Sequence, residues 1–179
     1  MSNSIFDRGL LRQCLSTCLL LTSYAVCAEE PALTAPEAQT VRWNLTLSPF
    51  TQHYHPKPEH KYVWLVGIER VDTDNSLMGV SYFQNSFGQD SVYIYPWGQT
   101  YPHLWGYEKL TGKWSAGLIY GYVKPYENKV PLNYNGYSVG FVPALSWDLG
   151  NRYEAQVSFP GGAGLMFHLQ VPLNPGQHN

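Results

Sequence analysis

The sequence predicts an all-β protein, an eight-stranded antiparallel up-and-down transmembrane β-barrel. Three observations lead to this prediction. Side chains alternate with a period of two from Val41 onward, in eight segments separated by turn residues. Aromatic residues are frequent at 15%, whereas charged residues make up only 13%, about half of the usual share. The N-terminus resembles an export signal, and an exported chain of this composition suggests a barrel, with a secreted β-sandwich as the alternative.

The first 28 residues have the layout of a secretory signal peptide. Arg8 and Arg12 precede an apolar run, and small residues occupy the −3 and −1 positions of a cleavage site after Ala28. No later segment is an uninterrupted apolar run of about eighteen residues, so no membrane-spanning helix is expected. All three cysteines precede the cleavage site, which excludes disulfides, zinc–thiolate sites and cysteine nucleophiles from the expected mature chain.

The remaining chain divides into a lead-in, a barrel and a tail. Residues 29–40 contain two prolines and no apolar face, so we expect a flexible lead-in, and residues 174–179 are a C-terminal tail. Residues 41–173 are expected to form the barrel. Its strands are predicted at residues 41–54, 62–71, 76–87, 91–101, 114–124, 136–147, 153–160 and 165–173. Residues 102–113, which end in the turn-like Thr111-Gly112-Lys113, are predicted as a connection that can lengthen either neighbouring strand.

The last and fifth strands indicate what each face of the barrel contacts. Alternate residues from Leu165 to Leu173 are all apolar, which suits contact with lipid. The fifth strand carries apolar or small side chains on both faces, so we expect a partly apolar interior. Such an interior suits an acyl chain rather than ions, although an eight-stranded barrel is also narrow enough to be filled by its own side chains.

The segment from Phe83 to Phe87 holds a candidate reactive hydroxyl. Ser86 follows Asn85 where the third strand ends, which is a place where a β-scaffold exposes side chains, although both residue types are also common in ordinary turns. Activation of a hydroxyl needs a base, and histidine is the usual one near neutral pH. His53, His55 and His60 lie around the first loop, which the up-and-down order places on the same rim as Ser86. Solvated loop histidines are the alternative.

Charge and residue type limit the other classes of function. The formal charge of −2 provides no electrostatic footprint for binding nucleic acid. The loop histidines lack the carboxylate-rich setting that would favour a zinc site. We therefore expect neither a nucleic-acid partner nor a metal or other cofactor.

Two prolines fall within predicted strands. Pro49 lies inside the first strand and Pro160 ends the seventh. Proline has no backbone N–H to donate to the hydrogen-bond ladder of a sheet. An unpaired backbone group in hydrocarbon costs several kcal/mol, so a gap of this kind needs a purpose. A weakened ladder can act as a lateral gate that lets a lipid chain pass between strands. A simple strand edge or bulge is the alternative.

These residues together resemble the lipid A palmitoyltransferase family (PagP) of Gram-negative outer membranes, over roughly residues 43–173. Phe83-Gln84-Asn85-Ser86-Phe87 is similar to the family's Phe-Lys-Asp-Ser-Trp, and Pro49 before His53 is similar to its strand-one proline and catalytic histidine. Residues 141–145 and 156–161 are similar to the closing strands of the family. The chain departs from the family at Asn85, which replaces an aspartate, in lacking an evident amphipathic helix before the barrel, and in its longer C-terminal tail.

The resemblance implies a monomeric outer-membrane acyltransferase that moves a palmitoyl-type chain from a phospholipid to lipid A. It implies His53 as base, Ser86 as hydroxyl partner and Asn85 as positioner or oxyanion donor, with His55 and Ser91 as alternative catalytic residues. Lipid A deacylation is the alternative in the same class, although its usual His-x-Ser motif is missing. A non-enzymatic barrel acting in transport or envelope interaction is the alternative in a different class.

Overall fold

The structure is a computed structural model and describes residues 40–173. Its strands form a closed barrel in sequence order, which confirms the predicted all-β fold and strand number. The strands are β1 (Arg42–His53), β2 (Leu65–Val71), β3 (Leu77–Gln84), β4 (Asp90–Tyr101), β5 (Leu110–Tyr120), β6 (Tyr137–Gly150), β7 (Tyr153–Ser158) and β8 (Gly164–Pro172). Two short 3-10 helices, η1 (Leu104–Gly106) and η2 (Glu127–Lys129), lie in connections. The predicted signal peptide, most of the lead-in and the tail lie outside the described residues.

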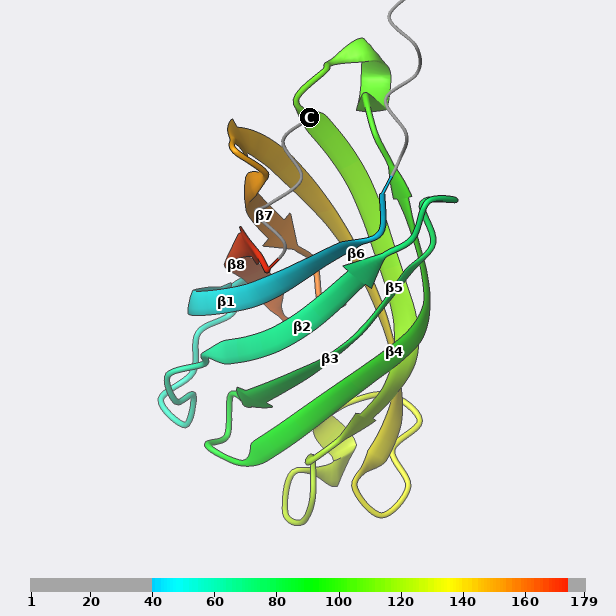
Figure 1. The fold of residues 1–179 in the computed structure, drawn as a ribbon. Coiled ribbons are helices and arrows are strands. Elements are labelled where there is room, and N and C mark those ends of the chain that lie inside the picture. Colours follow the sequence, from blue (N-terminus) through cyan, green and yellow to red (C-terminus); the bar gives the residue numbers. More distant parts are fainter. Residues whose placement is uncertain (1–39, 174–179) are drawn as a thin grey trace, which may run out of the picture. The chain divides into compact units, whose positions relative to one another are not determined.

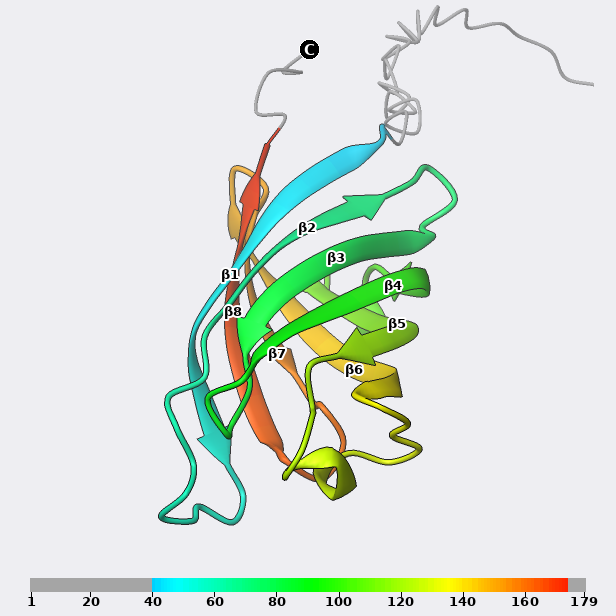
Figure 2. The same cartoon turned by 90° about the horizontal axis from the view of Figure 1, so that it is seen from below.

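Each strand pairs antiparallel with the next, and β8 returns to pair with β1 through partners such as Leu45 and Val171. This order places the connections on two opposite rims (Figures 1 and 2). Residues 54–64, 85–89, 121–136 and 159–163 form the loop rim. Residues 72–76, 102–109 and 151–152 form the turn rim. The last residue of β1 and the turn after β3 therefore share the loop rim, as predicted.

The outer face of the barrel is apolar along most of its strands. On β8, Phe167 and Leu169 are exposed while Met166 and Gln170 are buried, which confirms the predicted orientation of this strand. Other exposed apolar side chains in the strands include Val66, Ile68, Val80, Ile94, Leu118, Val139 and Phe141. Exposed aromatic rings lie near both strand ends: Tyr82, Tyr120 and Tyr137 toward the loop rim, Trp43, Trp147 and Tyr153 toward the turn rim. Within residues 40–173, no helix has the length and apolar character needed to cross a membrane.

The interior has an apolar half and a polar half. Phe83, Tyr93 and Tyr95 form a buried aromatic cluster. Further toward the turn rim, Lys113 Nζ lies 2.8 Å from Glu154 Oε2 and 3.2 Å from Glu69 Oε1, with all three side chains buried. The expectation of a partly apolar interior is therefore correct for one half, and the buried ion cluster of the other half was not foreseen.

The main difference from the predicted strands is in β5, which begins at Leu110 rather than at residue 114. The turn-like Thr111-Gly112-Lys113 lies within the strand, where Gly112 pairs with Tyr101 on one side and Leu145 on the other. Two ladders and the burial of Lys113 outweigh the local turn tendency of these residues. The strand ends at Tyr120 because Gly121 adopts a φ of 132°, outside the extended region.

Candidate functional site

The loop rim brings together two side chains that are 33 positions apart in the sequence. His53 Nε2 lies 2.7 Å from Ser86 Oγ, within hydrogen-bond distance. His53 is the last residue of β1, and Ser86 lies in the turn that follows β3. The structure thus places the predicted base and the predicted hydroxyl in direct contact.

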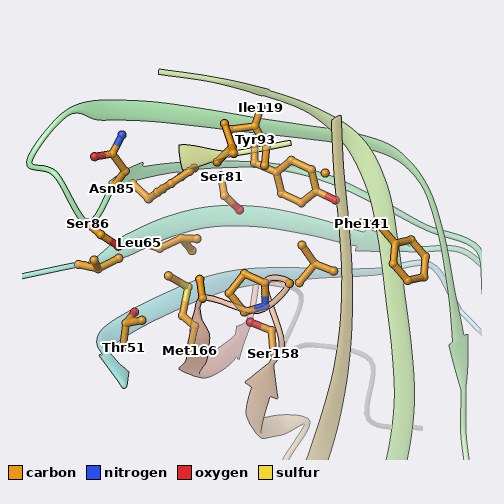
Figure 3. Close-up of a pocket in the computed structure, with 18 of the residues that line it drawn as sticks. Thr51, Leu65, Ser81, Asn85, Ser86, Tyr93, Ile119, Phe141, Ser158 and Met166 are labelled. Atoms are coloured by element: carbon orange, nitrogen blue, oxygen red, sulfur yellow. The ribbon is translucent and has the colours of Figure 1, made fainter. Parts of the chain in front are cut away.

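The position of Ser86 is set by the turn around Asn85. Asn85 Oδ1 accepts hydrogen bonds from the backbone N–H groups of Phe87 (2.9 Å) and Gln89 (3.1 Å). The backbone N–H of Asn85 also donates to the Gln89 carbonyl at 2.9 Å, and Gly88 supplies the positive φ of 77° that closes the turn. Figure 3 shows the Asn85 and Ser86 side chains leaving the turn in different directions.

The amide of Asn85 is already committed to this turn. Its Nδ2 atom lies 3.1 Å from Ser91 Oγ and 3.4 Å from the Gly121 carbonyl oxygen, and the residue is 1% exposed. The Asn85 amide does not contact His53, and its hydrogen bonds within the turn fit the predicted positioning role. Asn85 acts on Ser86 through the backbone of the turn.

The His60 ring packs beside the His53 ring and is in turn supported by aromatic side chains. The ring centroids of His53 and His60 are 4.4 Å apart, and the His60 ring meets the edge of Phe87 at 5.8 Å. Phe87 in turn stacks on Tyr126 at 4.3 Å. The backbone N–H of Lys61 donates to the Ser86 carbonyl at 2.8 Å, which ties the first loop to the turn.

The two alternative catalytic residues, His55 and Ser91, do not contact each other in the structure. His55 is exposed at the mouth of the cavity described below. Ser91 is 1% exposed, and its hydroxyl accepts from Asn85 Nδ2. Ser91 therefore belongs to the support of the turn.

The His53–Ser86 pair lies at the mouth of a cavity of about 630 Å³ inside the barrel. This volume is within the range of small-molecule sites. Its walls on the side of the loop rim are largely apolar, with Leu65, Phe83, Ile119 and Met166 among the lining residues (Figure 3). Burial raises the pKa of Tyr122, in the connection after β5, to about 12, so its phenol stays protonated near neutral pH.

The cavity also reaches the junction of β6 and β7. These two strands pair only from Ala144 and Ser158 toward the turn rim, with one further hydrogen bond from the Phe159 N–H to the Pro143 carbonyl. The β6 residues before Pro143 therefore have no ladder partner on β7. Phe141 and Pro160, on the two sides of this gap, both line the cavity.

Pro49 lies inside the first strand as predicted, whereas Pro160 does not end the seventh strand. Pro160 lies in the β7–β8 connection, because β7 ends at Ser158 rather than at residue 160. Pro49 lies inside β1, where the pairing with β8 shifts between Leu47 and Phe50, and this is a β-bulge. Pro96 interrupts the β4–β5 pairing in the same way, and sequence reasoning missed it.

Sequence reasoning also missed a second histidine–serine pair, deeper in the cavity. His168 Nε2 lies 2.7 Å from Ser158 Oγ, between β7 and β8. The alternation of β8 predicted an inward His168, but only the register between the two strands shows its partner. Among the described residues, no group of three His, Cys, Asp or Glu side chains is arranged to hold a metal ion.

Fold and site together define a closed eight-stranded barrel with an imidazole–hydroxyl pair at the mouth of an internal cavity. No protein-family model matches the chain, and no curated protein sequence matches it. The resemblance to the lipid A palmitoyltransferases stays a prediction from the motifs given above.

Proposed function

We propose that this protein is an outer-membrane acyltransferase that moves a fatty acyl chain from a phospholipid to lipid A. The observation that carries the proposal is the 2.7 Å contact between His53 Nε2 and Ser86 Oγ at the mouth of a cavity with apolar walls. The contact suits hydroxyl activation, and the cavity suits the hydrocarbon of the chain being transferred.

The pair supports two routes for the transfer. In the first, Ser86 Oγ attacks the ester carbonyl of the phospholipid while His53 takes the Ser86 proton and passes it to the departing lysophospholipid oxygen. A lipid A hydroxyl then attacks the acyl-serine ester, and His53 returns the proton from that hydroxyl to Ser86. In the second, His53 takes the proton of a lipid A hydroxyl as that oxygen attacks the phospholipid ester, and returns the proton to the departing lysophospholipid oxygen, while Ser86 orients the imidazole.

The outer surface supports a place in a membrane. Apolar strand residues with aromatic rings near both ends are typical of outer-membrane barrels. The loop rim with its His53–Ser86 pair then faces one leaflet of the bilayer. The unpaired edge of β6 beside Pro160 offers a lateral path by which an acyl chain enters the cavity.

The test compares lipid A from cells that produce the protein with lipid A from cells that lack it. Mass spectrometry should show one added acyl chain, and the addition should disappear with His53→Ala. Loss of an acyl chain would instead identify a deacylase. Unchanged lipid A, with the barrel folded in the outer membrane, would favour a non-enzymatic role.

The buried ion cluster across the interior argues against an open pore.

A further inference from the structure

The charged side chains that line the cavity fall into two groups. In the polar half, Lys113 binds the carboxylates of Glu69 and Glu154, so its charge is neutralised. At the loop rim, Lys57 and Lys129 also line the cavity. Among residues 40–173, no salt bridge involves either of these two lysines, and no carboxylate lines the cavity on this side. The mouth of the cavity is therefore positively charged, above walls that are largely apolar.

Lys129 is held beside the turn that carries Ser86. Its Nζ atom lies 5.6 Å from the centroid of the Phe87 ring, within the range of a cation–π contact. Phe87 follows Ser86 in the chain and stacks on Tyr126 at 4.3 Å. The backbone N–H of Lys129 donates to the Tyr126 carbonyl at 3.1 Å, which fixes η2 beside this stack. The Lys129 side chain is exposed, so its ammonium group can also contact a ligand at the mouth.

Lys57 supplies a second positive charge from the first loop. Its carbonyl accepts a hydrogen bond of 3.0 Å from the His60 N–H, and the His60 ring packs beside His53. The two loops also contain Glu59 and Glu127, but neither carboxylate lines the cavity. No salt bridge among the described residues joins either of them to Lys57 or Lys129. The positive charge of the mouth is thus not neutralised by its own loops.

A positive mouth above an apolar cavity suits a ligand that carries an anion close to an apolar chain, because opposite charges attract at a cleft of one sign. A phospholipid has this arrangement, since its phosphate and its acyl esters are attached to one glycerol. With an ester at Ser86, the phosphate would lie within a few bonds, on the side where Lys129 covers Phe87. Lysine binds phosphate as a compact point charge.

We propose that Lys129, assisted by Lys57, binds the phosphate group of a lipid whose acyl chain occupies the cavity. Holding the phosphate at the mouth places the ester of the same molecule beside Ser86. This site rests on the proposed function only in that the ligand is a lipid with an acyl chain in the cavity. Because both lysines are exposed, each contact contributes modestly to affinity and weakens as salt is added.

The test measures binding without turnover, so that its failure is distinguishable from failure of the acyltransferase proposal. The full-length mature barrel, folded in uncharged maltoside micelles at low salt, is loaded with a fluorescent monoacylglycerol. Monopalmitoylglycerol and palmitoyl-lysophosphatidylglycerol, which differ in the phosphate-containing headgroup, then compete for the cavity. The lipid with the phosphate should bind about tenfold more tightly, the effect of two exposed charge contacts, and added salt should reduce this advantage.

Lys129→Gln should remove most of the advantage and Lys57→Gln a smaller part, while monopalmitoylglycerol binds both variants as it binds the natural chain. Lys129→Arg should keep the advantage, because the positive charge remains. Lys124→Gln is the matched control, since it removes one charge from the same connection at a residue that does not line the cavity. Equal losses in Lys124→Gln and Lys129→Gln would overturn the proposal, because the effect would then come from net charge alone.

A second arm identifies the source of the phosphate by comparing lipid A with dephosphorylated lipid A as competitors. A lysine-dependent advantage in the lysophospholipid series assigns the site to the acyl donor, and one found only in the lipid A series assigns it to the acceptor. No lysine-dependent advantage in either series would overturn the proposal, as would the absence of binding by every probe. A lysine-dependent advantage with unchanged lipid A masses in cells would support this site and count against the acyltransferase proposal alone.

Discussion

Asn85 and Ser86 are neighbours in the sequence, but the structure assigns them different tasks. Ser86 contacts His53, whereas every polar atom of the Asn85 side chain holds the turn. The position at which the resembling family has a carboxylate is thus held here by an amide that makes the hydrogen bonds of the turn. The residue supports the backbone of Ser86 and makes no direct contact with the imidazole.

His53→Ala and Ser86→Ala should each lower acyl transfer by at least about a hundredfold, the usual effect of losing general base catalysis or the group that it activates. Lipid A mass spectra and an assay with purified lipids measure the loss. His55→Ala is the matched control, since His55 is exposed and has no part in the contact. If His55→Ala were inactive while the other two variants kept full rates, the site would be misassigned.

Asn85→Asp should destabilise the barrel by about 1–3 kcal/mol, the cost of a lost buried hydrogen bond. The new oxygen would replace the Nδ2 donor and face the carbonyl oxygen of Gly121 at a position now 3.4 Å away. Urea unfolding measures the change. A variant as stable as the natural chain would show that the turn does not depend on this amide.

At the scale of the strand, the proposed lateral gates lie where the pairing between neighbouring strands is irregular. The β1–β8 ladder has a bulge at Pro49, and β6 extends past the end of β7. Strand β5, by contrast, is paired with β4 and β6 along most of its length. It places Lys113 in the polar part of the interior. One barrel thus combines a fully paired region with a gap that meets the cavity.

A disulfide between Val142→Cys and Pro160→Cys should block acyl transfer reversibly, because it extends the β6–β7 register across the gap. Leu145→Cys with Val157→Cys is the control, since those residues are already paired. Activity is compared before and after addition of a reductant. Full activity in the oxidised Val142–Pro160 form would show that lipid does not pass through this gap.

The bulge at Pro49 is tested in the same way. A disulfide between Phe50→Cys and Phe167→Cys joins two residues that pair just beyond it. If this bulge is also a lateral gate, the oxidised form should lose activity and regain it on reduction. Unchanged activity would make the bulge a feature of the fold alone.

Lys113→Met should destabilise the barrel by about 3–5 kcal/mol, because it leaves the buried Glu69 carboxylate without its cation and Glu154 with only the partly exposed Arg42. The two ion pairs, at 2.8 and 3.2 Å, are both lost at once. Denaturant unfolding measures the effect, and adding Glu69→Gln and Glu154→Gln should restore much of the stability. Equal stability of Lys113→Met and the natural chain would contradict this role.

At the scale of the whole molecule, closure of the barrel pairs most strand residues among residues 40–173. The exceptions include β6 before Pro143 on its β7 side and β1 after Ser48 on its β2 side. An apolar outer face with aromatic ends and a polar half inside is the inverse of a soluble protein, whose apolar side chains gather in the core. This distribution is the physical basis for the proposed membrane location.

The protein should fractionate with outer membranes and be heat-modifiable, since a closed barrel keeps its backbone hydrogen bonds in cold detergent. Boiled and unboiled samples should migrate differently on a denaturing gel. Recovery of the folded protein in the soluble periplasmic fraction would contradict the proposed location.

The sequence alone was enough to predict the class of fold, the number of strands and the inward or outward direction of β8. These features depend on local alternation and turn residues, which each segment carries by itself. It was also enough to predict that His53 and Ser86 lie on the same rim, because the up-and-down strand order determines which loops are neighbours. The boundaries of β5 and β7 were less accurate, since pairing with neighbouring strands overrides local turn chemistry.

Only the tertiary structure decided which atoms meet. The contact of His53 with Ser86 and the pairing of His168 with Ser158 depend on the register between strands. A shift of one residue would turn strand residues such as His53, Ser158 and His168 to the other face. Register is the outcome of all eight ladders closing together, so no single segment of the sequence contains it.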